Sequence, residues 1–231
     1  MARLVVALIR HGAYHQLPGV PSAHQPFALT ELGRDQAHGC GRSIDAYARA
    51  NGLTVHPVID ASAQLRAWQT GELIRASLPG VTAVESHEAL AERGLGSAAN
   101  LTVEQIEAAL AADPRFEAPP PGWKSDSHYR LPLQGAESLM EAGTRVAEHL
   151  RARAAALHGH GLRRDTLKII VAHGAALRHG AHKLGILPFE RIAALSMFHA
   201  TPVYFEVSEN GRWRQVGGEW KVRARGETGL D

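Results

Sequence analysis

Two histidines each follow a continuous apolar run and stand directly before a glycine. Arg10 and His11 close the stretch LVVALIRHG, and His173 closes the stretch LKIIVAHG. Two imidazoles and a guanidinium suit a tetrahedral dianion, and a neutral imidazole is a competent nucleophile towards phosphorus when its other ring nitrogen is held in one tautomer. These residue types therefore indicate phosphoryl transfer, in which a protein supplies mainly positioning and cations around the oxygens.

The elements that must position these groups alternate between strand and helix. Both apolar runs are typical of buried parallel strands, because they do not alternate with polar residues. Further strands are predicted over His56–Ser62 and Val81–Glu85, with a closing hairpin that turns at Asn210-Gly211. Helices are predicted from the N-cap Thr30 to about Ala50, over Gln64–Leu78, from the capping box at Thr102 to Asp113, from Ala136 onwards, and over Gly174–Leu184.

This alternation predicts an α/β fold with three layers: a mostly parallel, doubly wound sheet with helices on both faces, as a single domain over residues 1–231. In such sheets ligands bind just beyond the carboxyl ends of the strands. We therefore expect Arg10, His11 and His173 to converge on one oxyanion-sized hollow. Gly12 and Gly174 are expected to let backbone and ligand approach closely there.

Six motifs, in order from residue 8 to about residue 185, resemble those of the histidine phosphatase superfamily, the phosphoglycerate mutase-like proteins. They are LIRHG, LTELGRDQA, ASAQLRAWQTG, LAERGLG, GAES and VAHG. The resemblance implies a phosphoglycerate mutase-like fold and makes His11 the nucleophile that becomes phosphohistidine. Arg10, Arg66 and His173 would hold the phosphoryl oxygens. Glu92 would be the general acid and then the base, and neither a metal nor another cofactor is implied.

Two neighbouring carboxylates, Glu85 and Glu88, compete with Glu92 for the acid role. The histidines His179 and His182, three apart, have the spacing of a metal pair, but no third ligand at a suitable distance accompanies them, so we interpret them as part of a solvated helix face.

The predicted function is hydrolysis of phosphomonoesters, on a phosphorylated small molecule or a phosphoprotein, with release of inorganic phosphate. A phosphoglycerate mutase is the first alternative, but Ala13 stands where mutase-like members generally carry an acidic or amide residue. Tyr14-His15 is more similar to phosphatase members. A non-catalytic phospho-ligand-binding module is the second alternative, although it would usually lose one of the catalytic groups.

Substrate choice is expected to depend on the loop Ala13–Phe27 and on a proline-rich, substrate-covering excursion near residues 113–134. Lys124, His128 and Arg130 in that excursion either hold a second anionic group or are ordinary surface charges. The aromatic residues Trp68, Trp123 and Tyr129 are interpreted as packing residues.

The composition of the chain bears on which macromolecular partners to expect. The formal charge of +2 comes without a block of lysine and arginine, so no nucleic-acid partner is expected. No apolar stretch approaches the roughly 20 residues that a membrane span needs. Cys40 is the only cysteine, which fits a reducing cytoplasm. A homodimer through an edge of the sheet is the one assembly considered.

Overall fold

The computed structural model describes residues 2–21 and 24–224, so that residues 22 and 23 of the predicted substrate loop lie outside the described part. Its main sheet has seven strands in the order β4-β3-β5-β1-β7-β8, with β2 paired to β5. The strands are β1 (Leu4–Arg10), β2 (Thr54–Val55), β3 (Val58–Ser62), β4 (Ala83–His87), β5 (Thr166–Ala172), β7 (Pro202–Val207) and β8 (Trp213–Gly217). The first five are parallel, whereas β7 and β8 form an antiparallel hairpin at one edge. The predicted α/β fold with a mostly parallel sheet is confirmed.

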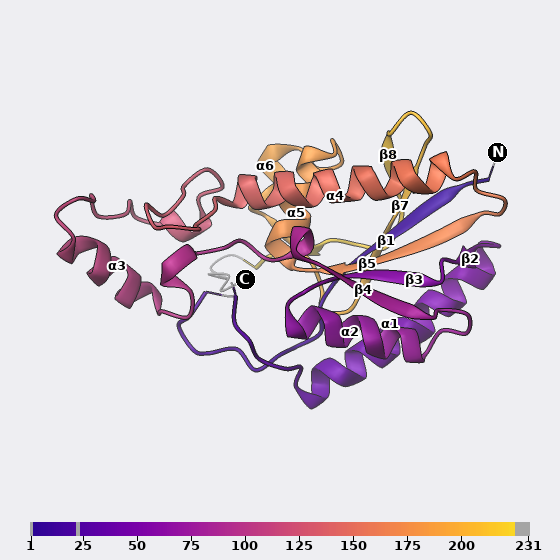
Figure 1. Ribbon diagram of the computed structural model, residues 1–231, viewed down its shortest axis with the longest axis horizontal. Coiled ribbons are helices and arrows are strands. Elements are labelled where there is room, and N and C mark those ends of the chain that lie inside the picture. Colours follow the sequence, from indigo (N-terminus) through magenta and orange to yellow (C-terminus); the bar gives the residue numbers. More distant parts are fainter. Residues whose placement is uncertain (1, 22–23, 225–231) are drawn as a thin grey trace.

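Helices cover both faces of this sheet (Figure 1). α1 (Glu31–Ala50) and α2 (Leu65–Ala76) lie on one face, and α4 (Leu139–Gly159) and α5 (Gly174–Lys183) lie on the other. The central strands β1 and β5 are buried along their whole length, because both of their faces pack against helices. A short helix α6 (Phe189–Ile192) and a two-stranded sheet of β6 (Leu195–Ser196) and β9 (Lys221–Val222) complete the second face. Among the described residues, no helix combines the length and the apolar character that crossing a membrane requires.

Capping residues set the helix boundaries. Thr30 accepts the N–H of Gly33 and starts α1 where the sequence predicts it. Ser138 and Glu141 form a capping box, so α4 begins at Leu139 rather than at Ala136. The third predicted strand also shifts by two residues, since β4 spans Ala83–His87. These shifts are small, and the predicted elements occur in the predicted order; the short elements β2, α6, β6 and β9 were not predicted.

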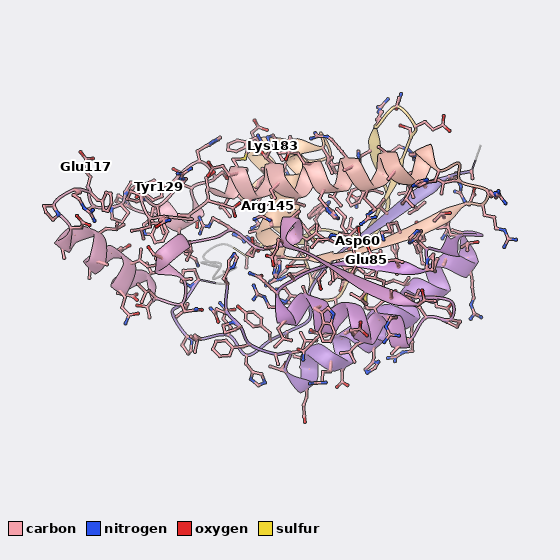
Figure 2. The ribbon with its side chains drawn as sticks, viewed as in Figure 1. Asp60, Glu85, Glu117, Tyr129, Arg145 and Lys183 are labelled. Carbon is pink, nitrogen blue, oxygen red and sulfur yellow. The ribbon has the colours of Figure 1, made fainter. Side chains whose placement is uncertain are left out.

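A long segment leaves the body of the molecule beyond the carboxyl ends of the parallel strands (Figure 1). It carries α3 (Val103–Ala112) and its own apolar cluster, made of Leu95, Ala98, Ile106, Leu110, Trp123, Leu131 and Ala136. Glu117 and Tyr129 mark its distance from Asp60 and Glu85 on the sheet (Figure 2). The excursion predicted near residues 113–134 is therefore the second half of a wider outlying segment, residues 95–136.

The neck of the outlying segment is closed by backbone hydrogen bonds. Glu137 donates its N–H to the carbonyl of Gly94 over 2.8 Å, and Leu95 and Ala136 form an isolated antiparallel bridge. Trp123 is only 2% exposed and donates its Nε1–H to Glu107, so its predicted packing role is confirmed. Trp68 on α2 is 39% exposed, and the same prediction is wrong for it.

Candidate active site

The five residues singled out for phosphoryl transfer all lie at the carboxyl end of a parallel strand or in the segment that follows it. Arg10 is the last residue of β1, and His11 comes directly after it. His173 follows β5, Arg66 lies in the first turn of the helix after β3, and Glu92 follows β4. Parallel strands deliver their carboxyl ends to one edge of the sheet, so residues up to 163 positions apart in the sequence meet there. The ring centroids of His11 and His173 are 5.1 Å apart.

His11 is held in a single tautomer. Its Nδ1 lies 2.8 Å from the carbonyl oxygen of Gly12, and because a carbonyl can only accept, Nδ1 carries the proton. Nε2 therefore keeps its lone pair, and it accepts the Nε–H of Arg66 over 3.1 Å. Burial lowers the pKa of His11 well below its usual value, and the charges of Arg66 and Arg10 lower it further. His11 is thus neutral near pH 7, with its lone pair on Nε2.

Arg66 is completely buried, which is unusual for an arginine on an amphipathic helix. It donates from Nη1 to the carbonyl of Gln25 over 3.0 Å, and its guanidinium carbon lies 4.5 Å from the centre of the Tyr14 ring. The Tyr14 ring also meets the His11 ring edge to face at 5.3 Å. Tyr14 therefore contacts both Arg66 and His11, which the sequence did not predict.

Arg10 completes the cationic side of the site from the end of β1. Its side chain is buried and donates from Nη1 to the carbonyl of Met197 over 3.2 Å. A Cβ on Gly174 would lie 3.2 Å from Cδ of Arg10, so this glycine makes room for the arginine side chain.

Gly12 also allows a close packing contact, in this case with the backbone at the start of α1. A Cβ at Gly12 would lie 2.5 Å from the carbonyl oxygen of Gly33, at the start of α1. A Cβ at Gly33 would lie even closer to the carbonyl oxygen of Ala13. Within the described part of the chain, the glycine after each histidine thus makes room for protein atoms, where we had expected it to admit a ligand.

His173 is oriented by Ser62. Its Nε2 lies 2.9 Å from Oγ of Ser62, which also accepts the N–H of Gln64 over 3.3 Å. The serine proton is therefore available to Nε2, which places the imidazole proton on Nδ1. That nitrogen is buried and has no hydrogen-bond partner among the described residues. Burial, followed by the charge of Arg66, lowers the pKa of His173 well below its usual value.

Glu92 is buried and bound to the first turn of α5. Its Oε2 accepts the N–H of Ala175 over 3.2 Å, and its Oε1 accepts the N–H of Ala176 over 3.0 Å and that of Arg93 over 2.9 Å. The positive end of the helix favours a carboxylate at this point. The competing carboxylates differ, because Glu85 and Glu88 are exposed. Only Glu92 of the three lies beside the residues that follow His173.

The three residues considered for binding a second anionic group, Lys124, His128 and Arg130, do not lie together in the structure. Lys124 lines a cavity beside α5, while His128 and Arg130 line another beside α4, where Arg130 pairs with Glu141 over 3.2 Å. Sequence reasoning also missed His199, whose ring centroid lies 5.8 Å from that of His11. His199 lies outside the six motifs, and no local sequence pattern around it indicates a place in the site.

The interpretation of His179 as part of a solvated face is wrong. Its ring is 1% exposed, and its two nitrogens bond the carbonyl of Ala175 over 2.8 Å and Oγ of Ser127 over 3.0 Å. The physical reason is Gly143 on α4, where a Cβ would lie 2.4 Å from Cβ of His179. Burial lowers the pKa of His179 to about 4. His182 bonds the carbonyl of Leu187 instead, so the two rings serve different partners.

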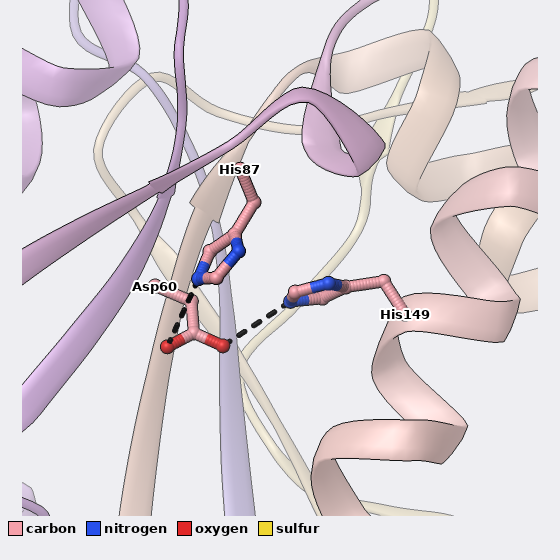
Figure 3. Close-up of side chains that lie close together, drawn as sticks. All are labelled: Asp60, His87 and His149. Carbon is pink, nitrogen blue, oxygen red and sulfur yellow. Dashed lines mark hydrogen bonds and ion pairs between the residues drawn. The ribbon is translucent and has the colours of Figure 1, made fainter.

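A second polar cluster surrounds Asp60, which is completely buried on β3 (Figure 3). Asp60, His87 and His149 each offer an atom within reach of one metal ion. However, Lys168 already lies 2.6 Å from one carboxylate oxygen and Arg153 lies 2.7 Å from the other. Burial alone would raise the pKa of Asp60, but His149, Lys168 and Arg153 together hold it well below its usual range. Lys168 and Arg153 thus already neutralise the carboxylate of Asp60, and a divalent cation would have to displace these two partners.

Comparison with known protein families gives one match that spans most of the chain. The model of the histidine phosphatase superfamily (branch 1) matches residues 6–218. A 2,3-bisphosphoglycerate-dependent phosphoglycerate mutase from Parvibaculum lavamentivorans is 27% identical over 209 residues, which are 90% of this chain and 92% of that relative.

Solved structures share the fold. A mycobacterial glucosyl-3-phosphoglycerate phosphatase is 23% identical with a TM-score of 0.66, and the match covers 93% of this chain and 96% of that one. The same mycobacterial enzyme in complex with inorganic phosphate gives 24% identity, 94% and 96% coverage and a TM-score of 0.63. An α-ribazole-5'-P phosphatase structure from Escherichia coli, described as putative, gives 20% identity, 94% and 95% coverage and a TM-score of 0.65.

Proposed function

Because the chain belongs to the histidine phosphatase superfamily, we propose that it hydrolyses phosphomonoesters through a phosphohistidine formed on His11. The observation that carries the proposal is the tautomer of this residue. The hydrogen bond from Nδ1 to Gly12 leaves the lone pair on Nε2, which accepts the Nε–H of Arg66 until a phosphoryl group binds, and the ring of His173 lies 5.1 Å from that of His11. Two solved relatives whose names describe phosphatases share the fold.

The first step forms the covalent intermediate. Nε2 of His11 attacks phosphorus, and the bond between phosphorus and the leaving oxygen breaks. Arg66 gives up its hydrogen bond to Nε2 and donates to an equatorial oxygen instead, while Arg10 and the Nδ1–H of His173 donate to the others. Removing one such donor from a preorganised site costs about 10²–10³ in turnover.

In the proposed mechanism Glu92 is the general acid of the first step and the general base of the second. A carboxyl group at this position gives the leaving oxygen its proton, and water then attacks phosphorus as the carboxylate accepts the water proton. The bond from phosphorus to Nε2 breaks, and inorganic phosphate leaves. Since Glu92 accepts three backbone N–H groups, the arrangement suits the ionised carboxylate of the second step. A substrate that binds as its monoanion brings a proton, which Glu92 takes up and then passes to the leaving oxygen in the first step.

The decisive experiment traps the intermediate. Protein mixed with a ³²P-labelled phosphomonoester should carry an alkali-stable, acid-labile label, and phosphate should appear in solution. His11→Ala should lose both, whereas Glu92→Gln should form or discharge the label about 10²–10⁴ times more slowly. Substantial phosphate release by His11→Ala would contradict the covalent route, and release by neither protein would favour a phospho-ligand-binding module.

A second candidate function is a phosphoglycerate mutase, which the named relative from Parvibaculum lavamentivorans favours. Against it stands Ala13, in a position where the mutase-like motif generally has an acidic or amide residue. The two are separated by incubation with 3-phosphoglycerate, with and without 2,3-bisphosphoglycerate. A mutase produces 2-phosphoglycerate, whereas a phosphatase produces glycerate and phosphate. We favour the phosphatase.

A further inference from the structure

Arg145 on α4 bonds the main chain that leads into Glu92. Its Nη1 lies 2.9 Å from the carbonyl oxygen of Ala89, 3.1 Å from that of Ala91 and 3.2 Å from that of Glu88. Its Nη2 lies 3.5 Å from the carbonyl oxygen of Glu92 itself, which is the longest of the four contacts. The chain forms a single 3₁₀ turn here, and the carbonyls at the end of such a turn have no partner inside it. Arg145 supplies the donors that these carbonyls lack.

Glu137 bonds the main chain on the other side of Glu92. Its Oε2 accepts the N–H of Gly94 over 3.0 Å, and its own N–H donates to the carbonyl of Gly94. Both of its carboxylate oxygens also accept from Arg145, Oε1 from Nε over 2.9 Å and Oε2 from Nη2 over 2.7 Å. A bidentate pair of this kind fixes orientation as well as charge. We call Arg145 and Glu137 the clamp, because together they bond the chain before and after Glu92.

The clamp takes the place of regular secondary structure around Glu92. Residues 91–94 belong to no helix and to no strand. The bonds from Ala175 and Ala176 of α5 hold the carboxylate of Glu92, but they do not hold the main chain that carries it. The two side chains of the clamp are only 26% and 27% exposed, so their ion pair is screened less than one on the open surface. The position of Glu92 therefore depends on α4 as well as on α5.

We propose that Arg145 is a positioning residue for Glu92, which together with Glu137 sets the place of the Glu92 carboxylate relative to the leaving oxygen. A general acid acts only within hydrogen-bond reach of the oxygen that it protonates, and a displacement of about 1 Å can cost about 10²-fold in rate. Because Nε, Nη1 and Nη2 of Arg145 are all committed to protein partners, this arginine acts through Glu92 rather than on the substrate. The inference rests on the proposed function, since it concerns the general acid of that reaction.

The test compares two substrates that differ in their need for a proton. Glycerol 3-phosphate has an alkoxide leaving group that must be protonated, whereas p-nitrophenyl phosphate releases a stabilised phenolate. The ratio kcat/KM covers the steps up to the phosphoenzyme and so isolates the first step. Arg145→Met should lower kcat/KM for glycerol 3-phosphate by roughly 10- to 100-fold, and that for p-nitrophenyl phosphate by less than about threefold. An equal loss on both substrates, or no loss on either, would overturn the inference.

Arg151→Met is the matched control. Arg151 is an exposed arginine on the same helix, and it donates to the carbonyl of Lys183. Its replacement should leave both kcat/KM values within about twofold. Glu137→Gln removes the charge of the clamp carboxylate and should cause the same selective loss to a smaller degree, which keeps the inference testable if Arg145→Met does not fold. Arg145→Lys keeps the charge but loses the fork, so it should recover only part of the loss.

A double-mutant cycle separates positioning of Glu92 from general support of the fold. In Glu92→Gln the carboxyl proton is already gone, so its correct placement no longer matters. Adding Arg145→Met should then lower kcat/KM for glycerol 3-phosphate by no more than about twofold. If the two losses multiplied in full, Arg145 would act on another part of the site, and the inference would be wrong.

Amide hydrogen exchange keeps the two proposals apart, because it needs no turnover. The N–H groups of Ala175 and Ala176 lie in the first turn of α5, where a helix offers them no partner, and they donate to Glu92. Arg145→Met should speed the exchange of these two N–H groups by about tenfold, in proportion to the lost local stability. The N–H of Gly12, which is bonded on the phosphoryl side of the site, should exchange as in the wild type.

The outcomes for the two proposals are distinct. If wild-type protein releases no phosphate from either substrate, yet Arg145→Met shows this exchange pattern, the phosphatase proposal fails and the positioning of Glu92 by Arg145 stands. If wild-type protein releases phosphate, but Arg145→Met alters neither the exchange rates nor the ratio between the two substrates, only the assignment of Arg145 fails.

Discussion

Arg66 donates its Nε–H to Nε2 of His11 over 3.1 Å, so that one guanidinium holds the nitrogen that attacks phosphorus in the proposed mechanism. That lone pair becomes available only when an oxyanion draws the guanidinium away. We therefore expect Arg66→Lys to lower kcat by about 10²–10³, because an ammonium cannot bond His11, Gln25 and an oxygen in one plane. The matched control is Arg75→Lys at the other end of α2, where the side chain pairs with Glu72. Steady-state kinetics on both variants checks the prediction, and equal effects would contradict it.

Tyr14 should matter through its ring. Its face lies 4.5 Å from the guanidinium carbon of Arg66, and a desolvated contact of this kind is worth about 2 kcal/mol, or roughly 30-fold. Tyr14→Leu should therefore lower kcat/KM by roughly that factor. Tyr14→Phe keeps the ring and should lose much less. If the two variants were equally impaired, the hydroxyl rather than the ring would be the working group.

Ser62 should act on turnover through His173. The hydroxyl holds Nε2 over 2.9 Å and thereby keeps the Nδ1–H donor in place. Ser62→Ala should reduce kcat by about tenfold, with the pH–rate profile shifted because the imidazole loses its fixed tautomer. Ser86→Ala, at an exposed position on the neighbouring strand β4, should leave both unchanged. An unaltered pH profile in the Ser62 variant would assign the serine a purely structural role.

Asp60 should be a major determinant of stability rather than a metal ligand. Asp60→Asn leaves the buried ammonium of Lys168 without its counter-charge, which should lower the free energy of unfolding by about 3–5 kcal/mol. Glu85→Gln is the control, because this exposed partner of Arg153 should be worth at most about 1 kcal/mol. Urea unfolding at pH 7 measures both. Added Zn²⁺ should leave the Tm of the wild type unchanged, and a Tm increase that His149→Gln abolishes would establish a metal site instead.

Acid should destabilise the fold well before carboxylates titrate. Burial holds the pKa of His11, His173 and His179 below the usual value, to about 4 for His179. Below about pH 6.5 the unfolded chain binds more protons than the folded one, so the free energy of unfolding falls as pH decreases. Each such histidine contributes up to about 1.4 kcal/mol per pH unit between 6.5 and its folded pKa. The change in the free energy of unfolding per pH unit should become smaller in His179→Gln, by the contribution of up to one proton. It should stay the same in the exposed control His160→Gln. Equal pH dependence in wild type and His179→Gln would refute this account.

The sequence predicts that the two histidines lie at the same edge of the sheet, and the pairing of β1 with β5 in the structure brings them together. Residues 11 and 173 both end buried parallel strands, and such strands share one edge of the sheet. Residue types alone could not single out Glu92 among three nearby carboxylates, because the choice depends on where the first turn of α5 lies; only the resemblance of the LAERGLG motif favoured it. The Ser62 bond to His173 spans 111 positions and leaves no local pattern. His179 was misjudged because its burial depends on Gly143, a small residue on a different helix.

Residues 95–136 pack around an apolar cluster of their own, separate from the core on either face of the main sheet. This segment is joined to the body at its neck and also contacts α4 and α5, through Arg130 to Glu141 and Ser127 to His179. Exchanges within it that keep these contacts should leave the packing around His11 undisturbed. Grafting the corresponding stretch of another superfamily member onto this neck should therefore change the surface beside the candidate active site while leaving His11 and its neighbours in place.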